Sequence, residues 1–422
     1  MKYSVKKSIL SGTIEIPPSK SHTHRALIFA LLTTGVSKID KYLDSPDSAA
    51  MLKTIKHLGA KITKSKNCLE IEGVGSKPHP SDDIIDASNS GIVLRFIGAL
   101  AALIPAYTVI TGDHSIRTRR PVKPLLEGLK QLGVFAESMT GDGYAPIIIK
   151  GPLETGCCTL DGQDSQPISA LLIATSFAQG PSEIHVTNPG EKPWIDLTLS
   201  WFDFLKLPYE NQGYTHYKIP GSARISGFNY TVPGDFSSLA FPVAAALITQ
   251  SEISIKNVDM NDIQGDKKLL DFIRQMGGKL ESEGRTLHVK KSGLLKGQTF
   301  DVNDTIDGIT TLAVLGCYAE GETVLTNGAI ARKKECDRIR SIATELKKMG
   351  ADIEEREDGL LIRGSKLRGA TLETYHDHRM AMSLTVAALG AEGESTIDGV
   401  ECIAKTYPNF KEHMNKLGAH VQ

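Results

Sequence analysis

Aromatic residues and net charge are both scarce in this sequence. Aromatic side chains make up 6% of the 422 residues, and the formal net charge is −1. A chain without an excess of basic residues has no global field to attract nucleic acid or an anionic membrane. No apolar run has the length needed to cross a bilayer, and the N-terminal M-K-Y-S-V-K-K-S lacks the apolar core of a signal peptide. We therefore expect neither nucleic-acid nor membrane partners, and any anion site must be local.

The cysteine, histidine and glycine patterns argue against several kinds of site. The six cysteines include no C-x-x-C pair and no zinc spacing, which favours reduced thiols in a cytoplasmic protein. The adjacent Cys157 and Cys158 are interpreted as neighbours on a strand. The twelve histidines show no H-x-x-x-H cluster with a supporting carboxylate, so no metal is predicted. A Walker glycine loop and a G-x-G-x-x-G motif after a strand are also missing, so no ATP or NAD cofactor is predicted.

An internal repeat organises the chain. An amphipathic helix closed by a bulky apolar residue, a glycine and a small residue, and followed by a strand, recurs along the sequence. Glycine is the usual residue just after a helix end. These glycines are Gly59, Gly133, Gly277, Gly350 and Gly418, and in a degenerate copy at Leu207 we expect Pro208 to end the helix. Successive copies are 68 to 74 residues apart, which predicts six units of nearly constant length.

A second, almost wholly apolar helix alternates with the first. A helix that is apolar all round is a buried helix. Each copy is followed by a short strand, and a hairpin such as residues 280–290 completes the unit. One unit is therefore β-α-β-α-β-β, and the fold class is α/β, or α+β, with six such repeats. The buried helices are predicted near Ala26, Phe96, Ser169, Ala240, Ile309 and Ala381.

The two ends of the chain complete each other. The sixth unit stops one strand into its hairpin, and the N-terminal residues have the pattern of the missing strand. We predict one three-repeat domain at 18–231 and a second made of 1–17 plus 232–422. Two crossings, near Pro18 and Pro233, would join them as a hinge. We expect the active site in the cleft between the domains, and expect bound anions to favour closure.

The segment at 16–27, I-P-P-S-K-S-H-T-H-R-A-L, leads into the first buried helix with its charges at an unusual end. Lys20 and Arg25 lie in or near the first turn, where the helix dipole favours anions. Helix N-termini bind phosphate readily, so this arrangement is favourable if an anion arrives. For a single lysine at a helix start, the alternative to anion binding is that the side chain extends into solvent. His22 and His24 are expected to be packing or rim residues.

Similar polar segments precede the other buried helices. Capping is the simplest explanation for many of these residues. We predict it for Ser88, for Asp235 and for one of Asp304 and Asp307. Capping does not explain Arg25 or Arg379.

Two further cation clusters lie at the starts of amphipathic helices. One such cluster can be a solvated face, but four clustered helix starts in a chain of net charge −1 favour a site for polyanionic small molecules. Glu335 and Asp307 lie among these cations, which is where an acid and a base for proton transfer to a bound anion are expected. The alternative for each residue is a helix cap or an ion pair. The clusters are Arg117, Arg119, Arg120 and Lys123, and Arg332, Lys333, Lys334 and Arg338.

Taken in order, these segments resemble the 5-enolpyruvylshikimate-3-phosphate (EPSP) synthase family. The motifs that carry the resemblance are P-x-S-K-S-x-x-x-R-A-L at 17–27, R-R-P at 119–121, K-E-C-D-R at 334–338, D-H-R-M-A-M at 377–382 and K-T-Y-P at 405–408. The resemblance extends from about residue 10 to the end. It implies the two-domain enolpyruvyl-transferase fold, with three β-α-β-α-β-β copies in each domain, which agrees with the repeat count above.

The resemblance implies a transferase of the shikimate pathway, which leads to chorismate and the aromatic amino acids. The enolpyruvyl group of phosphoenolpyruvate would pass to the 5-hydroxyl of shikimate 3-phosphate, with release of phosphate. The implied shikimate 3-phosphate ligands are Lys20, Ser21, Arg25, Ser165, Gln166, Asp307 and Lys334. The implied phosphoenolpyruvate ligands are Lys20, Gly91, Arg120, Gln166, Arg338, Arg379 and Lys405. Asp307 would accept the hydroxyl proton, and Glu335, with Lys20 and His378, would handle the proton at the enol methylene.

Several positions depart from the family pattern. The usual serines at two places are Asp164 and Glu191 here, and the usual asparagine is Ile330. These changes bear on shikimate 3-phosphate binding. Ile92 and Phe96 replace the usual threonine and proline beside Gly91. Since glyphosate occupies the phosphoenolpyruvate subsite in this family, we hypothesise that the added bulk reduces glyphosate sensitivity.

Three other interpretations remain open. UDP-N-acetylglucosamine enolpyruvyl transferases resemble this chain in fold, but they carry a reactive cysteine in a loop that here reads H-S-I-R-T-R-R-P. A non-catalytic anion- or RNA-binding protein on the same repeats is disfavoured by the neutral charge and the lack of aromatics near the basic clusters. A family member with drifted activity is the third. The expected partners are the two small-molecule substrates, and a monomer is expected.

Overall fold

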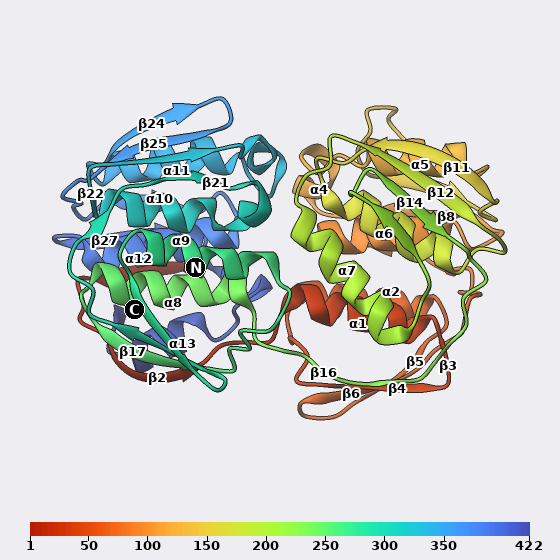
Figure 1. Cartoon of the computed structure of the whole chain (residues 1–422), viewed down its shortest axis with the longest axis horizontal. Helices are drawn as coiled ribbons and strands as arrows, with labels where there is room; N and C mark the ends of the chain where they lie inside the picture. Colours follow the sequence, from red (N-terminus) through yellow and green to blue (C-terminus); the bar gives the residue numbers. More distant parts are fainter. The chain divides into compact units, whose positions relative to one another are not determined.

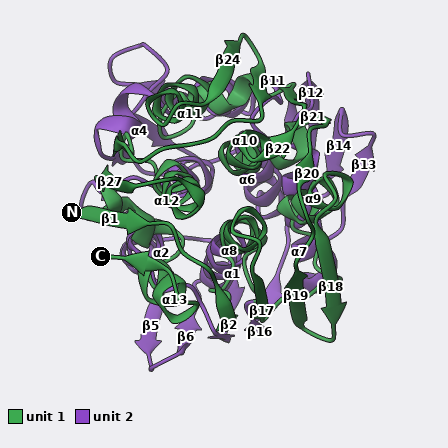
Figure 2. Cartoon of the chain, turned by 90° about the vertical axis from the view of Figure 1, so that its left-hand side faces the viewer, with its two compact units in different colours: residues 1–19, 233–422 green, residues 20–232 purple.

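The computed structural model describes residues 1–422 and divides into two compact units (Figures 1 and 2). Unit 1 comprises residues 1–19 and 233–422, and unit 2 comprises residues 20–232. Both units combine helices with strands, so the predicted mixed α/β class is confirmed. Each helix is either too short or too polar to cross a membrane.

Unit 2 holds fourteen strands and eight helical segments. Its strands are β3 (Thr33–Thr34), β4 (Val36–Asp40), β5 (Lys61–Lys64), β6 (Cys68–Glu72), β7 (Ile85–Asp86), β8 (Thr108–Thr111), β9 (Phe135–Ser138), β10 (Ile147–Lys150), β11 (Gly156–Asp161), β12 (Ser182–Thr187), β13 (Glu210–Gln212), β14 (His216–Ile219), β15 (Ile225–Ser226) and β16 (Asn229–Thr231). Its helices are α1 (Lys20–Leu31), α2 (Pro46–His57), the π-helix η1 (Val93–Ile97), α3 (Gly98–Ala101), α4 (His114–Thr118), α5 (Lys123–Gln131), α6 (Ser165–Ser176) and α7 (Lys192–Leu205).

Unit 1 also holds fourteen strands, and has ten helical segments. Its strands are β1 (Lys2–Lys6), β2 (Ser11–Glu15), β17 (Glu252–Lys256), β18 (Lys279–Glu283), β19 (Thr286–Lys290), β20 (Leu295–Lys296), β21 (Thr299–Asp301), β22 (Ala319–Glu320), β23 (Glu322–Thr326), β24 (Asp352–Arg356), β25 (Gly359–Arg363), β26 (Thr371–Glu373), β27 (Glu394–Asp398) and β28 (His420–Val421). Its α-helices are α8 (Phe236–Ile248), α9 (Lys268–Gln275), α10 (Ile309–Cys317), α11 (Arg338–Lys348), α12 (His378–Gly390) and α13 (Phe410–Lys416). Its 3₁₀ segments are η2 (Gly265–Lys267), η3 (Asn303–Gly308), η4 (Ala329–Lys333) and η5 (Val400–Lys405).

Six four-stranded sheets, three in each unit, share one pairing pattern. In each sheet one outer pair of strands is parallel, and the other two pairs are antiparallel. The sheet β11-β12-β14-β13 is an example. A parallel pair needs a crossover helix, whereas a hairpin supplies an antiparallel pair, so one repeat contributes both. The common pattern is that of a repeated β-α-β-α-β-β unit.

The N-terminal strands belong to sheets formed by the C-terminal repeats. β1 pairs with β27 and β28, and β2 pairs in parallel with β17. The two segments that leave unit 1 also bond to each other, because Ser19 N donates to Pro233 O at 2.7 Å and Asp235 N donates to Pro17 O at 2.9 Å. Both chain termini lie in unit 1 (Figure 2).

The apolar helices form the core of each unit. In unit 1, α8, α10 and α12 pack on one another, and nearly all of their residues are buried. In unit 2, η1 and α3 pack on α6, while α1 packs on α2 and α7. The amphipathic helices end as predicted at glycines with φ between +75° and +105°, at residues 59, 133, 277, 350 and 418. In the degenerate copy, however, α7 ends at Leu205 and is followed by Lys206 in the left-handed conformation with φ +57°, so Pro208 is not the residue that ends the helix.

The capping predictions are only partly correct. Asp235 caps α8 by accepting a hydrogen bond from Ser238 N at 2.7 Å. Ser88 caps no helix; Ser90 instead accepts from Val93 N at 3.3 Å. Neither Asp304 nor Asp307 caps α10, because no side chain bonds to that helix start.

Candidate active site

In unit 2, a buried cation lies at the start of the first apolar helix. Arg25 is 4% exposed, and its Nη2 donates to Thr198 Oγ1 at 2.8 Å and to Trp194 O at 3.0 Å. The Arg25 guanidinium also lies over the Phe96 ring, 5.4 Å from its centroid. All of these partners are neutral, and burial lowers the pKa of Arg25. A buried guanidinium without a carboxylate partner is a strong binding group for an incoming anion.

A second cluster in unit 2 surrounds Gly91. Arg95, which is 2% exposed, donates to Gln166 Oε1 at 2.9 Å and pairs with Asp164 at 3.1 Å. A Cβ at Gly91 would lie 2.8 Å from Arg95 Nη1 and 2.9 Å from Arg120 Nη1. Glycine is therefore the residue that lets the backbone approach two guanidinium groups. The structure brings together the predicted residues Gly91, Arg120 and Gln166, and adds Arg95, which the sequence analysis missed.

The start of α6 is occupied by an acid. Ser165 donates both its backbone N–H and its hydroxyl to Glu191 Oε2, each at 3.1 Å. Glu191 is 2% exposed and adopts a left-handed backbone with φ +46°. Asp164 caps the same helix by accepting from Gln166 N at 3.0 Å. Two carboxylates thus lie at a helix N-terminus, where the dipole stabilises negative charge.

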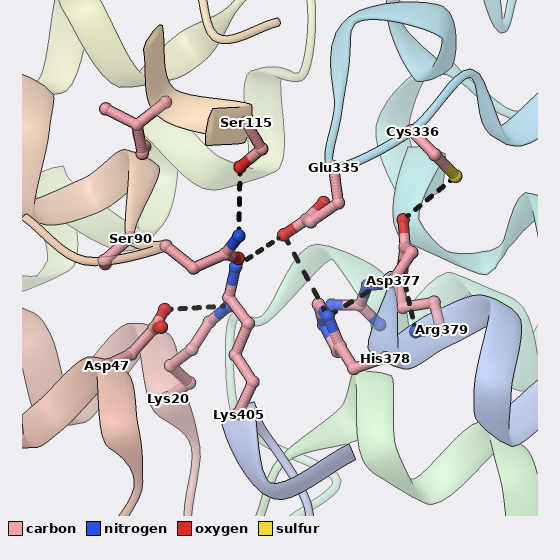
Figure 3. A network of polar contacts seen from close by, with 12 residues as sticks. Lys20, Asp47, Ser90, Ser115, Glu335, Cys336, Asp377, His378, Arg379 and Lys405 are labelled. Carbon is pink, nitrogen blue, oxygen red and sulfur yellow. Dashed lines mark hydrogen bonds and ion pairs between the residues drawn. The ribbon is translucent and has the colours of Figure 1, made fainter. Parts of the chain in front are cut away.

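The remaining predicted residues of unit 2 differ in setting. Lys20 Nζ lies 3.8 Å from Asp47 Oδ2 at the start of α1 (Figure 3). Ser21 accepts from Arg25 Nη1 through its carbonyl at 3.3 Å. Of the four cations at 117–123, only Arg120 is buried.

His22 and His24 are both buried, and Trp201 donates to His22 Nδ1 at 3.1 Å, so both are packing residues and not rim residues.

In unit 1, one arginine holds three carboxylates. Arg338 donates through Nε to Asp377 at 2.8 Å, through Nη1 to Asp307 at 2.7 Å and through Nη2 to Glu335 at 2.7 Å. Its side chain is 1% exposed. Burial disfavours the charged form, but the three carboxylates outweigh burial and raise the pKa of Arg338 well above its usual value. This guanidinium fixes the predicted acid and base in one arrangement.

Asp307 has a second arginine partner. Arg379, from the first turn of α12, donates through Nη2 to Asp307 Oδ2 at 2.7 Å. Burial alone would raise the pKa of Asp307, but Arg379, Arg338 and Lys334 together hold it well below its usual range. Asp307 is therefore an ionised carboxylate with both oxygens bound.

Glu335 bridges the remaining predicted residues of unit 1. Lys405 Nζ donates to Glu335 Oε1 at 2.8 Å, and His378 Nδ1 lies 4.0 Å from the same oxygen (Figure 3). His378 is 1% exposed, so this imidazole is shielded from solvent.

Lys334 is half-buried and acts on Asp307 through its charge. Arg332, by contrast, pairs with Asp337 and Glu355 at 2.8 Å each, as a structural ion pair.

Two further acids escaped the sequence analysis. Asp377 is fully buried, caps α12 through Arg379 N at 2.8 Å and holds Arg338. Asp266 accepts hydrogen bonds from the hydroxyls of Ser237 and Thr305. Burial and the negative charge of Asp307 raise the pKa of Asp266 to about 6. Asp377 belongs to the D-H-R-M motif, but no role was predicted for it. Asp266 lies in a short 3₁₀ segment that has no sequence signal.

Comparison with known proteins identifies the family. The family model for EPSP synthase (3-phosphoshikimate 1-carboxyvinyltransferase) matches residues 5–414. The chain belongs to the EPSP synthase family. The 3-phosphoshikimate 1-carboxyvinyltransferase of Acetivibrio thermocellus is 43% identical over 421 residues, covering 100% of this chain and 99% of that protein. The Methanocaldococcus jannaschii protein of that name is 42% identical over 420 residues, covering 98% of this chain and 97% of that protein.

The solved structures agree with this assignment. An EPSP synthase from Acinetobacter baumannii superposes with a TM-score of 0.84 at 28% identity, covering 100% of this chain and 99% of that one. The EPSP synthase fold predicted from the repeats and motifs is therefore confirmed.

Proposed function

We propose that this chain transfers the enolpyruvyl group of phosphoenolpyruvate to the 5-hydroxyl of shikimate 3-phosphate and releases phosphate. The observation that carries the proposal is that Arg338 binds both Asp307 and Glu335, so that a proton acceptor and a proton donor are fixed beside cations. The relatives' names support the same reaction. As a finer proposal, the enzyme acts as a cytoplasmic monomer on these two small molecules.

The proposed chemistry is an addition followed by an elimination. Asp307 accepts the proton of the 5-hydroxyl as its oxygen attacks C2 of phosphoenolpyruvate, while C3 gains a proton. Phosphate then leaves C2 as C3 gives a proton back, and the enol ether forms. Glu335, with Lys20 and His378, carries the proton to and from C3. Removing a positioned acid or base of this kind typically costs a factor of 10²–10⁴ in rate.

Substrate binding tunes Asp307 in this proposal. Arg338 and Arg379 pair with Asp307 in the structure and keep it a weak base. The phosphoenolpyruvate anion competes for the same guanidinium groups, which raises the pKa of Asp307 toward its usual value. Asp307 thus becomes a competent base only when the substrate is bound. Arg120 and Lys405, with Gly91 and Gln166, are proposed to complete the phosphoenolpyruvate ligands.

Shikimate 3-phosphate is proposed to bind the other cations. Arg25 has only neutral partners and is available for an anionic substituent. Lys20, Ser21, Ser165, Gln166 and Lys334 are the further proposed ligands. Glu191 competes with the phosphate for the start of α6, because it already accepts both hydrogen bonds of Ser165.

The decisive experiment measures phosphate release from phosphoenolpyruvate by the purified chain. We expect release with shikimate 3-phosphate and none with phosphoenolpyruvate alone. Two further arms use UDP-N-acetylglucosamine, the acceptor of the related transferases, and shikimate without its phosphate. Release that is independent of shikimate 3-phosphate, or that requires UDP-N-acetylglucosamine, would reject the proposal.

A further inference from the structure

Two histidines and a glutamate cluster on one sheet face of unit 2. Glu183 and His185 are two residues apart on β12, so their side chains share a face. His216 lies on β14, directly opposite His185 in the antiparallel register. One ligand atom of each side chain lies within 4.8 Å of the other two. The side chains are 47%, 43% and 18% exposed for Glu183, His185 and His216, so solvent reaches the cluster.

The hydrogen bonds of His216 leave room for a bridging cation. Its Nε2 lies 2.8 Å from Glu183 Oε2, and its Nδ1 lies 3.3 Å from Gln212 Oε1. Both facing atoms are oxygen acceptors. When Nδ1 carries the hydrogen toward Gln212, the lone pair of Nε2 faces the carboxylate, and a proton or a metal ion must lie between them. In that tautomer Gln212 accepts the hydrogen bond of Nδ1, which is the kind of support that a metal-ligating histidine has.

His185 supplies a second nitrogen to the same oxygen. Its Nε2 lies 3.9 Å from Glu183 Oε2, and the two imidazole rings are stacked with centroids 4.2 Å apart and planes 7° from parallel. Zinc binds imidazole nitrogen and carboxylate oxygen at about 2.0–2.2 Å, which places neighbouring ligand atoms roughly 3.3 Å apart at a tetrahedral ion. The observed 2.8 and 3.9 Å lie on either side of that spacing, so modest side-chain rotations bring the ligands to an ion.

We propose that Glu183, His185 and His216 bind one divalent transition-metal ion. The ligands are Nε2 of each histidine and the carboxylate, and water completes the coordination. Two imidazoles with one carboxylate suit zinc, copper, nickel or cobalt better than magnesium or calcium. None of these residues belongs to the candidate active site, so the ion cross-links β12 and β14 and takes no part in the proposed transfer reaction.

Two neighbours on the same face bear on the site. Lys218 pairs opposite Glu183 on β14, and Cys157 pairs opposite Glu183 on β11. No ion pair joins Lys218 to Glu183 within 4.0 Å, so the carboxylate faces the histidines. Cys157 is an exposed free thiol and is a rival ligand for soft metals. The experiment must therefore separate thiol binding from the proposed site.

The experiment titrates the full chain with Zn²⁺ by calorimetry and with Co²⁺ by visible absorption. We expect one ion per chain, with affinity reduced at least tenfold in His216→Ala and in Glu183→Gln. Gln212→Ala keeps all three ligands and should weaken binding by about tenfold, as loss of a ligand's supporting hydrogen bond does. Cys157→Ser should leave the affinity unchanged.

His288→Ala is the matched control. His288 Nε2 lies 3.8 Å from Glu283 Oε2 on another sheet hairpin, a histidine–glutamate pair that lacks the second histidine. Loss of the His288 side chain should not change the number of metal ions bound per chain. Absence of binding by the unchanged chain, undiminished binding by folded His216→Ala, or loss of binding in Cys157→Ser would each overturn the proposal. Circular dichroism establishes that each variant is folded.

Discussion

Nη2 of Arg379 donates to Oδ2 of Asp307 at 2.7 Å, so the start of α12 binds the carboxylate that precedes α10. The contact joins two neighbouring repeats of unit 1. It also uses a charge whose position at a helix N-terminus is unfavourable, because the dipole there repels cations. An acid of the adjacent repeat offsets that cost.

Asp307→Asn removes the proposed proton acceptor while keeping its shape. We expect kcat to fall by roughly 10²–10⁴-fold. Phosphoenolpyruvate should bind at least as tightly as before, because Arg338 and Arg379 remain and no longer pair with the Asp307 carboxylate. Steady-state kinetics and equilibrium binding measure the two quantities. Asp304→Asn is the matched control, because Asp304 pairs with Lys268 at the surface. An Asp307→Asn enzyme that keeps a tenth of the activity would contradict the assigned role.

Glu335→Gln tests the proton at the enol methylene. The amide cannot transfer a proton, so we expect turnover to fall by at least 10²-fold while both substrates still bind. Exchange of the C3 hydrogens of phosphoenolpyruvate in deuterated water should be lost in parallel. Glu355→Gln, which alters a structural pair with Arg332, should leave the exchange intact. Wild-type exchange in Glu335→Gln would remove the residue from the mechanism.

Glu191→Ser relieves competition at the start of α6. The glutamate carboxylate now accepts from Ser165 N and Oγ, in the favourable field of the helix dipole. A phosphate at the same place gains about 1 kcal/mol once that acid is gone, which lowers the KM for shikimate 3-phosphate about fivefold. The KM for phosphoenolpyruvate should not change. An unchanged or raised KM for shikimate 3-phosphate would show that Glu191 does not compete with it.

Ile92→Thr tests the glyphosate hypothesis. Ile92 follows Gly91, where an added Cβ would contact Arg95 and Arg120, and Ile92 is 9% exposed. Reducing this bulk enlarges the space beside the proposed phosphoenolpyruvate ligands, so we expect stronger inhibition by glyphosate. Inhibition curves at fixed phosphoenolpyruvate, with its KM measured alongside, compare the two enzymes. Identical inhibition constants for the original and substituted enzymes would refute the hypothesis.

Asp266 makes the stability of unit 1 depend on pH. Burial and the charge of Asp307 raise the pKa of Asp266 to about 6, above the unfolded value of about 3.9. Between these values the unfolded chain loses the proton first, so the free energy of unfolding falls as pH rises, by up to about 3 kcal/mol. Asp266→Asn cannot titrate and should lack this fall in denaturant unfolding at pH 4 to 6. A fall of equal size in the variant would assign it to another group.

The repeat pattern predicted the architecture because it reports on local geometry. Glycines such as Gly59 and Gly418 take positive φ, and the apolar helices have no exposed face, so both features are written in single residues or short windows. The short strand predicted after each apolar helix is also found; β17, Glu252–Lys256, for example, follows α8. Lys206 was missed because a left-handed lysine has no sequence signature.

Clusters formed across strands and helices were harder to foresee. Arg95 lies on the buried side of η1, where its sequence neighbours predict only packing. The cluster of Glu183, His185 and His216 escaped a search for helical histidine spacing, because its third member comes from a different strand. Glu-x-His within a strand was the available signal. Contacts of this kind depend on sheet register, which the sequence alone did not reveal.

The pairing of β1 with β27 and β28 has a consequence for protein synthesis. Lys2 pairs with Asp398, so β1 leaves the ribosome long before β27, which follows almost 400 residues later. At 5–20 residues per second this delay is roughly 20–80 s. All the strands of unit 2 lie between residues 33 and 231, so unit 2 can fold while translation continues. The sheet of β26, β27, β1 and β28 can close only after residue 421 has left the ribosome, and until then β1 presents an unpaired strand edge to chaperones and to neighbouring chains.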